Sequence, residues 1–373
     1  AFIPAFYTRI GEVSADTKSY LYLNPTKLLR ESINIWNPNI GAGTVTHQML
    51  GYLWPMGPYY FVMDLLRIPD WVAQRCWWGL LIFMAALGAR LVAKTLGASL
   101  VASMLAGLAY GFSPYFLQYF SRLSGLLLPW AGLPFLIWCV VRARTDSSWR
   151  WPALFALITG TVGTVNATAL IMSGLGVVVW MIADALSRVT TWRDTLRFGW
   201  RSGVLCLGVS VWWINGLLIQ GKFGLPILRY TETYETVAKA SSVQEIVRGL
   251  GYWFFYGGDK LGRWVGPRAS YLTNPLVLVI GWSVAGLGLL CVMTSNHRHK
   301  LHLALLLLFG LAVAVGAAPI GGPSVYGRFF ARLVHNESGF ALRSTPRAAP
   351  MVILALALGI AFGYDQIKNA CAD

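Results

Sequence analysis

The stretch WVAQRCWWGLLIFMAALGARLVA, from Trp71 to Ala93, is apolar over most of its length. A helix needs about 20 such residues to cross the roughly 30 Å of hydrocarbon in a bilayer. Similar runs recur along the chain, and they are continuous rather than alternating in polarity, which indicates helices and not barrel strands. The sequence therefore predicts an all-α polytopic membrane protein. The predicted spans are Trp71 to Ala93, Leu100 to Phe116, Leu126 to Val141, Trp151 to Val165, Ala167 to Leu186, Val204 to Ile219, Pro275 to Thr294, Leu301 to Ala318 and Pro350 to Gly363.

The charge of the chain supports this interpretation. The 373 residues are 56% hydrophobic and 12% charged, with a formal net charge of +15. A basic chain can indicate a nucleic-acid partner, but here Arg and Lys lie mostly in short connections between apolar runs. The charge therefore reports membrane topology, and we expect no nucleic-acid partner. The five cysteines lack metal-type spacing, so we interpret them as packing residues.

Basic residues fall on alternate connections between the predicted spans, and the positive-inside rule places those connections in the cytoplasm. They are Arg90, Lys94, Arg142, Arg144, Arg150, Arg188, Arg193, Arg197, Arg201, Arg298 and Lys300. The opposite face receives residues 8–70, the turns near Ser121 and Asn166, and the segments 220–274 and 319–349. We therefore expect a multi-pass protein of the plasma membrane whose site faces the periplasm and cell wall.

The same pattern divides the chain. Residues 1–70 are expected to hold the end of a truncated first span and an extracytoplasmic loop, since AFIPAFYTRI lacks Met and is too short to span. A transmembrane bundle follows at 71–219, an extracytoplasmic loop at 220–274, and further transmembrane helices at 275–373 around an outer loop at 319–349. The long apolar stretch around Asn166 is split at GTVGTVNAT because Gly, Asn and Thr suit a tight turn. The closing NACAD has no terminating feature, so more chain could follow.

Two segments of the first loop are predicted to be short helices. NPTKLLRESINIW places Leu28, Leu29, Ile33 and Trp36 close to one helical face, and GPYYFVMDLL is a second candidate. Amphipathic helices too short to span can lie in the membrane interface. Packing against the bundle without lipid contact is the alternative.

Asp16 is the sharpest candidate for chemistry. It lies just after the inferred first span, where a carboxylate would meet lipid head groups and any phosphate held there. Such a carboxylate can bind a divalent cation (Mg, Mn or Ca) or deprotonate a sugar hydroxyl. A helix N-cap in SADTK is the alternative. Glu12, four residues earlier, could share the cation if the segment is helical, and Lys18 is a candidate for substrate binding.

The stretch GTVTHQMLGYLWPMG, from Gly43 to Gly57, mixes aromatic and hydrogen-bonding residues outside any span. Aromatic faces cover the apolar side of a sugar ring while Gln and His bind hydroxyls, so His47, Gln48 and Tyr52 are candidates for substrate binding. Tyr52 and Trp54 could equally be interfacial anchors. His47 has no Cys or second His nearby, which gives little support for a metal ligand.

Arg343 and Arg347, in ALRSTPRAAP, precede the last predicted span on the outer side. Guanidinium groups at that depth could bind a lipid-linked phosphate through two hydrogen bonds. Solvated arginines are the alternative, although cations are disfavoured at a helix N-terminus. In the loop 220–274, Glu232 and its neighbours could bind an acceptor glycan or form a solvated lid. The sequence has no P-loop, GxSxG or HExxH motif, which argues against ATPase and hydrolase classes.

The pattern resembles the GT-C class of membrane glycosyltransferases. More narrowly, SADTKSYLYLNPTKLLRESINIWNPN followed by GYLWPMGPYYFVMDLLRIPDWVAQRCWWGLL is similar to the AftD-type arabinofuranosyltransferases of actinobacteria. FSPYFLQYFSRLSGLLLPWAGLP extends the resemblance to Pro134. Met56 stands where that family has a polar residue, and LRSTPRAAP departs from its Arg-and-Lys segment. Family members are also much longer and carry carbohydrate-binding modules.

The resemblance implies a GT-C-like helix bundle with interfacial helices in its outer first loop, and Asp16 at the position of the essential carboxylate. It implies inverting transfer of arabinofuranose from decaprenyl-phosphate-arabinofuranose to cell-wall arabinan, in arabinogalactan or lipoarabinomannan. A polyprenyl-phosphomannose-dependent mannosyltransferase, a polyprenyl-linked sugar flippase and a structural subunit are the alternatives. Whether a further protein subunit takes part is left open.

Overall fold

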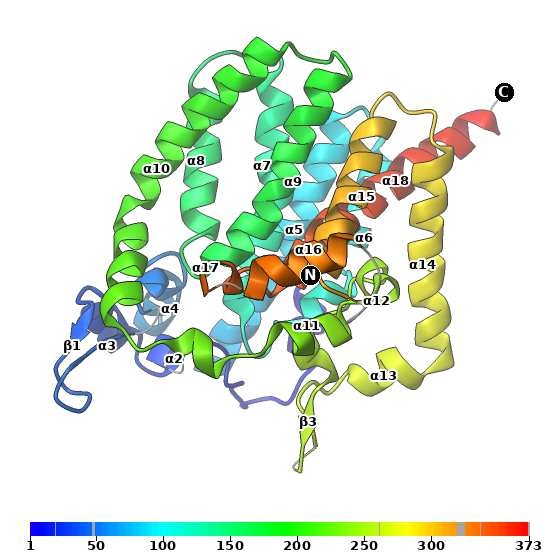
Figure 1. Cartoon of the computed structure of the whole chain (residues 1–373). Coiled ribbons are helices and arrows are strands. Elements are labelled where there is room, and N and C mark those ends of the chain that lie inside the picture. Colours follow the sequence, from blue (N-terminus) through cyan, green and yellow to red (C-terminus); the bar gives the residue numbers. More distant parts are fainter. Residues whose placement is uncertain (19, 47–48, 261, 319–324, 336, 372–373) are drawn as a thin grey trace.

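The computed structural model describes residues 1–373 except 19, 47–48, 261, 319–324, 336 and 372–373. Within the described residues, long helices run between the two ends of one bundle (Figure 1). They are α5 (Asp70–Thr95), α6 (Leu100–Gly111), α7 (Leu127–Ala143), α8 (Arg150–Val162), α9 (Ala167–Leu186), α10 (Trp192–Phe223), α14 (Pro275–Thr294), α15 (Lys300–Val315) and α18 (Ala349–Ala370). Each predicted span has one of these helices, so the all-α membrane fold is confirmed.

Shorter elements gather mainly at one end of the bundle, which we call the site end. The short α-helices are α1 (Phe2–Phe6), α2 (Tyr20–Leu23), α3 (Pro25–Ser32), α4 (Met56–Leu65), α11 (Tyr234–Ala240), α12 (Val243–Val247), α13 (Arg268–Thr273), α16 (Val325–His335) and α17 (Glu337–Phe340). The 3₁₀ helices are η1 (Leu50–Leu53), η2 (Pro114–Gln118), η3 (Ser124–Leu126), η4 (Ile227–Tyr230), η5 (Trp253–Tyr256) and η6 (Thr345–Ala348). Two hairpins pair β1 (Trp36–Asn37) with β2 (Thr44–Val45) and β3 (Gly258–Asp259) with β4 (Gly262–Arg263).

Seven helical segments of the described chain are long and apolar enough to cross a membrane, and α15, with 16 residues, is shorter. The prediction of Val204–Ile219 is wrong at its start, because α10 spans 32 residues from Trp192 to Phe223. Hydropathy detects only the apolar part of a helix, whereas Arg193, Arg197 and Arg201 are good helix formers that extend it. The predicted boundary at residue 219 also lies inside this helix. Helix α8, with 13 residues, is too short to cross the bilayer alone.

The turn predicted around Asn166 is confirmed. Helix α8 ends at Val162 and α9 begins at Ala167, where the Asn166 side chain accepts a hydrogen bond from the Ala169 N–H at 2.9 Å. This cap satisfies a donor that the first helical turn leaves unpaired. A Cβ at Gly163 would lie 2.5 Å from Leu170, so the close approach of the two helices requires glycine there.

The two short helices predicted in the first loop are present as α3 and α4. Asn24 caps α3, and Leu28 is fully buried. Ile33 and Trp36, expected on the same face, lie beyond the end of α3 and are exposed. The chain leaves the helix there and enters hairpin β1–β2, which no helical pattern can predict. Lipid contact of α3 and α4 stays a prediction.

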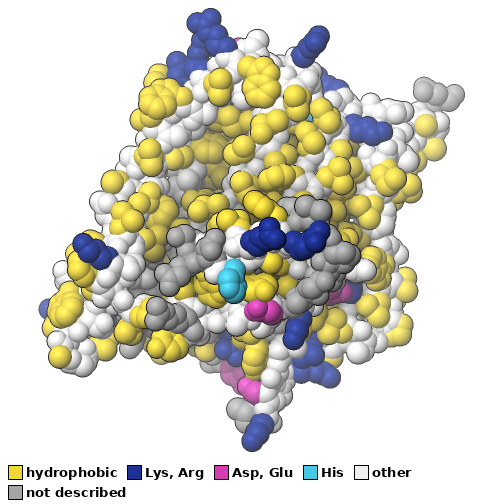
Figure 2. Space-filling model, viewed as in Figure 1, with side chains coloured by type: hydrophobic (Ala, Val, Ile, Leu, Met, Phe, Trp, Pro, Cys, Tyr) yellow, Lys and Arg dark blue, Asp and Glu magenta, His cyan; other side chains and the backbone are white. Residues whose placement is uncertain are grey.

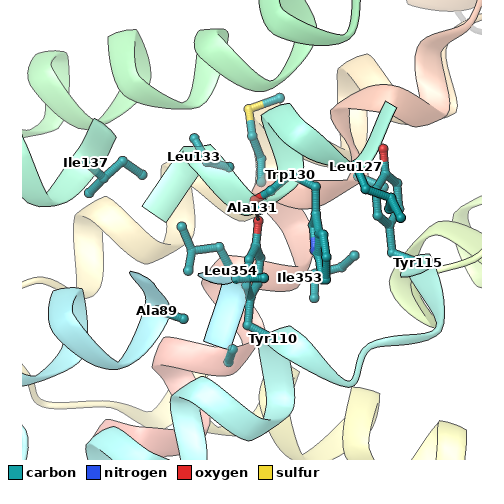
Figure 3. Packing of buried hydrophobic residues seen from close by; sticks show 14 of the residues in the cluster. Ala89, Tyr110, Tyr115, Leu127, Trp130, Ala131, Leu133, Ile137, Ile353 and Leu354 are labelled. Carbon is teal, nitrogen blue, oxygen red and sulfur yellow. Dashed lines mark hydrogen bonds between the residues drawn. The ribbon is translucent and has the colours of Figure 1, made fainter. Parts of the chain in front are cut away.

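Small residues and aromatic stacking build the core. Helix α5 packs on α6 and α7, and a Cβ at Gly107 of α6 would lie 2.7 Å from the Ala86 carbonyl oxygen of α5. Such close backbone approach is typical of helices that associate in lipid. Figure 3 shows Tyr110 against Trp130, with the Tyr110 hydroxyl donating to the Trp130 carbonyl at 2.7 Å. Helix α18 passes beside them through Ile353 and Leu354, both buried.

The other end of the bundle, the basic end, carries the Arg-rich connections, and dark-blue side chains gather at the top of Figure 2. A buried ion pair joins α7 to α9 there. Asp184 accepts hydrogen bonds from Arg144 at 2.5 Å and 3.1 Å and pairs with His302 of α15 at 2.6 Å. The predicted separation of basic connections from long polar segments is thus present in the fold.

Candidate functional site

Asp16 is buried at the site end, with 1% of its surface exposed. Its carboxylate accepts hydrogen bonds from the Trp78 indole at 3.1 Å and from the Ser124 main-chain N–H at 2.8 Å. The carboxylate therefore lies against the start of η3, rather than capping a turn of its own segment as the alternative interpretation expected. It joins the first loop to helices α5 and α7.

The first turns of α5 hold the Asp16 segment in place. Buried Gln74 accepts from the Ser14 N–H at 2.9 Å and donates to the Ser14 carbonyl at 2.8 Å. Buried Arg75 donates to Thr8 at 2.7 Å and to the Glu12 carbonyl at 2.9 Å. Sequence reasoning treated these residues only as part of an apolar span and a family motif. The presence of Gln74 and Arg75 in an otherwise apolar run is the sequence signal for these contacts, because buried polar groups need hydrogen-bond partners.

Thr17 follows Asp16 in the left-handed backbone region, with φ of 55°. Its N–H donates to the Arg122 carbonyl at 2.7 Å, and the Ser14 hydroxyl donates to the Ser121 carbonyl at 2.8 Å. A positive φ at a β-branched residue is strained, and such strain persists only where surrounding contacts enforce it. The loop between α6 and α7 supplies those contacts and fixes the direction of the Asp16 side chain.

Burial raises the pKa of Asp16 to about 6, although hydrogen bonds from Ser124 and Trp78 partly offset this. The pKa values of the tyrosines near Asp16 are shifted by the same burial. Burial raises the pKa of Tyr52, Tyr22 and Tyr60, and the nearby Asp16 carboxylate raises it further in each case. A carboxyl group whose pKa lies near 6 is ionised at neutral pH and basic enough to accept a proton.

A cavity of about 270 Å³ lies next to the Asp16 segment: Thr17 lines it, whereas Asp16 itself is not among the lining residues. Every outer segment predicted from the sequence contributes to its wall: the first loop, the turns near Ser121 and Asn166, and the segments 220–274 and 319–349. The lining residues are Thr17, Tyr52, Leu123, Gly125, Leu126, Val165, Asn166, Thr168, Ile227, Leu228, Thr231, Glu232, Tyr252, Ala341, Arg343 and Arg347. The structure thus brings Tyr52, Arg343 and Arg347 together next to the Asp16 segment.

The two arginines of this wall differ in their partners. Arg343 donates from Nε to the Glu232 carbonyl at 2.6 Å and from Nη2 to the Thr231 hydroxyl, and it lies 3.5 Å from the Glu232 carboxylate. Among the described residues, the Arg347 side chain donates one long bond, of 3.3 Å, to the Asn166 side chain. Its buried Nε has no hydrogen-bond partner among the described residues. Arg343 therefore fixes the 231–232 loop, whereas Arg347 has donors to offer to a ligand.

Tyrosine rings form another wall. Tyr252 lines the cavity and stacks on Tyr119, with ring centroids 4.5 Å apart, and Tyr119 contacts Tyr115 at 5.1 Å. Buried Gln118 accepts from the Tyr252 N–H at 2.7 Å and donates to the Gly249 carbonyl at 3.0 Å. The loop 220–274 is thus pinned to the bundle at the cavity, so Glu232 belongs to the site wall and not to a detached lid.

The remaining predicted residues have different environments. Lys18 is half-buried, burial lowers its pKa, and it does not line the cavity. Glu12 is exposed and pairs with Arg9 at 3.3 Å, and residues 11–17 form no helix, so the helix that would have aligned Glu12 with Asp16 is not present. His47 and Gln48 lie outside the described residues.

The available ligand side chains decide whether the site could bind a divalent cation. Among the described residues, no group of three or more His, Cys, Asp or Glu side chains could hold a metal. Asp16 has both oxygens engaged by N–H donors, yet each oxygen keeps a second lone pair. Asp16 can therefore contribute one ligand to a cation, and the other ligands would have to come from substrate and water.

An apolar groove lies along helices α8, α9 and α10. It occupies about 790 Å³ between α8, α9 and α10 and continues in a hollow of about 490 Å³ along α10. Gly174, Gly199 and Gly203 line the larger part, and next to Gly174 and Gly203 a Cβ would meet open space. Ile171 of α9 lines the groove and Thr168, three residues earlier, lines the cavity, although the groove and the cavity have no lining residue in common.

Comparison with known proteins gives consistent matches. Residues 1–372 match the family described as the N-terminal GT-C domain of alpha-(1->3)-arabinofuranosyltransferase. An alpha-(1->3)-arabinofuranosyltransferase of Mycolicibacterium smegmatis is 30% identical over 354 residues, and one of Mycobacterium tuberculosis is 29% identical over 368. These matches cover 94% of this chain in both cases, and 24% and 25% of the relatives.

The fold has solved counterparts as well. A cryo-EM structure of the arabinofuranosyltransferase AftD from mycobacteria superposes with a TM-score of 0.76 at 25% identity, over 98% of this chain and 24% of that one. A mutant of the same enzyme superposes with a TM-score of 0.70. The chain thus spans about a quarter of the length of the curated relatives it matches.

Proposed function

The chain belongs to the family described as the N-terminal GT-C domain of alpha-(1->3)-arabinofuranosyltransferase, and from that premise we propose that it carries the site of a glycosyl transfer. The donor is decaprenyl-phosphate-arabinofuranose, and the acceptor is cell-wall arabinan of arabinogalactan or lipoarabinomannan. The observation that carries the proposal is the buried Asp16 carboxylate, one residue from Thr17 in the wall of a cavity that Arg347 also lines, with a buried Nε that has no partner among the described residues.

The reaction is a single displacement that inverts the anomeric carbon. An acceptor hydroxyl oxygen forms a bond to that carbon as the bond to the phosphate oxygen breaks. Asp16 accepts the hydroxyl proton, and the phosphate leaves with the bonding electron pair. The pKa of Asp16, which burial raises to about 6, suits this role because the group is ionised at neutral pH and still basic.

Arg347 stabilises the leaving phosphate. Of the cavity cations that the structure describes, Arg347 is the one with a buried unpartnered donor, and fixed donors aimed at developing charge lower a reaction barrier without reorganising. Arg343 acts indirectly, because it holds residues 231–232 in place through its hydrogen bonds to Glu232 and Thr231. Tyr52 binds the donor ring. His47 and Gln48, which lie outside the described residues, stay sequence-based candidates for the same role. Lys18 does not line the cavity and would act on the phosphate only through its charge.

The prenyl tail of the donor lies in the apolar groove between α8, α9 and α10. The groove reaches Ile171 on α9, three residues after the cavity residue Thr168, and from there the lipid would extend its phosphate toward Arg347. Burial of hydrocarbon contributes about 0.8 kcal/mol per CH₂ group, which makes a long tail a strong anchor. A phosphate leaving group also removes any need for ATP at this site.

A divalent cation (Mg, Mn or Ca) is the cofactor that we propose. Asp16 would supply one oxygen, while Glu12 is exposed beside Arg9 and does not fit the role. Mg²⁺ commonly binds one or two carboxylates together with substrate phosphates and waters. We therefore expect the cation to join the site together with the donor, where it would add positive charge next to the leaving phosphate.

The site faces the periplasm and cell wall in this proposal. The support is the concentration of Arg and Lys at the opposite end of the bundle, as the positive-inside rule expects of a cytoplasmic face. An arabinan acceptor and a lipid-linked donor can meet on the outer face. The protein would then be a multi-pass enzyme of the plasma membrane.

The decisive experiment offers the purified full-length protein radiolabelled prenyl-phosphate arabinose or prenyl-phosphate mannose, with a synthetic arabinan acceptor. We expect incorporation of arabinose only. Incorporation of mannose alone would keep the reaction class and change the sugar. Transport of the labelled lipid across proteoliposomes without incorporation would support the flippase alternative and contradict the proposal.

A further inference from the structure

Helix α16 has one face packed against the bundle. Phe330 and Val334 are 7% and 0% exposed, and they form a small core with Ala238 of α11 and with Ala317 and Ala318, just after α15. Figure 1 shows α16 crossing the front of the bundle, at a large angle to the long helices. The helix therefore lies along the surface instead of continuing through the bundle.

The exposed residues of α16 include two parallel rows. Phe329 and Leu333 are 64% and 39% exposed, and they stand four residues apart on one flank. Arg328 and Arg332, also four residues apart, are exposed on the adjacent flank. Residues at this spacing lie above one another on a helix. In Figure 2, dark-blue side chains lie over this helix next to a broad hydrophobic surface.

The position of α16 along the bundle axis follows from α15. Helix α15 starts at Lys300 at the basic end and has 16 residues, which gives a length of roughly 24 Å at about 1.5 Å per residue. Ala317 and Ala318, on which α16 packs, therefore lie near the far boundary of a hydrocarbon layer of about 30 Å. A helix with an apolar flank and a basic flank at that depth fits the headgroup region of a bilayer.

We propose that α16 is a membrane-surface helix that binds anionic phospholipid headgroups of the leaflet at the site end. Phe329 and Leu333 enter the acyl layer, and Arg328 and Arg332 bind lipid phosphates. The charge of the arginines and the depth of the helix favour this occupant over a soluble partner. The choice does not depend on the sugar that the enzyme transfers.

Helix α17 links α16 to the cavity wall. Arg343 donates to the Phe340 carbonyl at 3.1 Å, and its guanidinium lies 4.3 Å from the centre of the Phe340 ring. Phe340 ends α17, which packs on α16. Lipid bound to α16 therefore steadies the segment that carries Arg343 into the cavity wall.

Photo-crosslinking tests the location. A benzoylphenylalanine at position 329 of the full-length protein in nanodiscs should crosslink to phospholipid, while the same probe at the exposed position 263, in hairpin β3–β4, should not. A crosslink from 329 to another part of the protein, or to no lipid, would overturn the proposal because the flank would then be covered or in water.

Native mass spectrometry tests the charge preference. From nanodiscs that contain phosphatidylglycerol and phosphatidylcholine, the wild-type protein should retain phosphatidylglycerol. Arg328→Gln and Arg332→Gln should each weaken that retention about fivefold. The matched control Arg263→Gln removes an exposed arginine of the projecting hairpin and should leave retention unchanged. Equal losses in the control, or unchanged retention in the α16 variants, would refute the lipid assignment.

Discussion

The indole Nε1 of Trp78 donates a hydrogen bond to the Asp16 carboxylate over 3.1 Å, although 62 residues separate the two in the chain. The bond favours the ionised carboxylate and partly offsets the burial that raises the pKa of Asp16 to about 6. Ser124 supplies the second such bond. The basicity of the proposed base therefore depends on a residue of α5 that never has to touch substrate.

Trp78→Phe should raise the pKa of Asp16 because it removes one donor to the charged form. We expect the acid limb of the profile of kcat/KM against pH to move up by about one unit, which corresponds to roughly 1.4 kcal/mol. Trp138→Phe is the control, since the Trp138 indole donates to the Thr95 hydroxyl at 3.1 Å and contacts neither Asp16 nor Ser124. Equal shifts in both variants would mean that general repacking, and not the hydrogen bond, sets the limb.

The pH profile of the wild-type enzyme follows from the same group. A base must be ionised, and Asp16 gains its proton as the pH falls through about 6. Activity should therefore fall about tenfold per pH unit below that point. Asp16→Asn should lower kcat by a factor of about 10² to 10⁴, the typical range for general acid–base catalysis, and should abolish the limb. Binding of decaprenyl phosphate, measured by thermal shift, should persist in this variant; an Asp16→Asn enzyme with wild-type kcat would eliminate Asp16 as the base.

Arg347 and Arg343 should respond differently to loss of charge. Arg347→Gln should weaken donor binding with little change in melting temperature, because its guanidinium makes one long bond in the free protein. Arg343→Gln should destabilise the fold, since removing one partner of a buried pair typically costs about 3–5 kcal/mol. Donor titration and thermal unfolding separate the two effects. The same phenotype for both variants would contradict the assignment of different roles.

Much of this site is predictable from the sequence, and the reasons are local. Span positions follow from apolar runs, and the alternating basic connections place Asp16, Tyr52, Arg343 and Arg347 at one end of the bundle. The structure places Tyr52, Arg343 and Arg347 in the wall of one cavity, together with Thr17, the residue after Asp16. Asp16 can likewise be predicted as a candidate without knowledge of distant contacts, because its position after a span and in a polar loop is visible in the nearby sequence.

The unpredicted part depends on contacts between distant residues. Gln74 and Arg75 hold the Asp16 segment across 60 or more residues, yet a hydropathy window reads them only as interruptions of an apolar run. Asn166 reaches Arg347 across 181 residues, which no local pattern reports. The predicted start of α10 at Val204 is wrong for a related reason. The basic residues that mark the end of a membrane span are also good helix formers, so the helix begins earlier, at Trp192.

The proposed cation should bind together with the donor. Asp16 is the carboxylate that we propose for it, and among the described residues no group of three His, Cys, Asp or Glu side chains is formed in advance. Mg²⁺, Mn²⁺ or Ca²⁺ alone should therefore leave the melting temperature unchanged, whereas the ion with decaprenyl phosphate should raise it above the value with the lipid alone. Asp16→Asn should remove this additional rise. A shift with the ion alone that survives in Asp16→Asn would locate the cation elsewhere.

The last prediction concerns the groove between α8, α9 and α10. Gly203 lines both parts of the groove, and a Cβ there would meet open space, so Gly203→Leu fills the groove without straining the helix. We expect a higher KM for a decaprenyl donor and little change for a donor with a short prenyl chain, because only the long chain needs the filled volume. Gly208→Leu is the matched control: Gly208 also faces open space on α10 but does not line the groove. A larger effect in the control than in Gly203→Leu would place the tail on another face of α10.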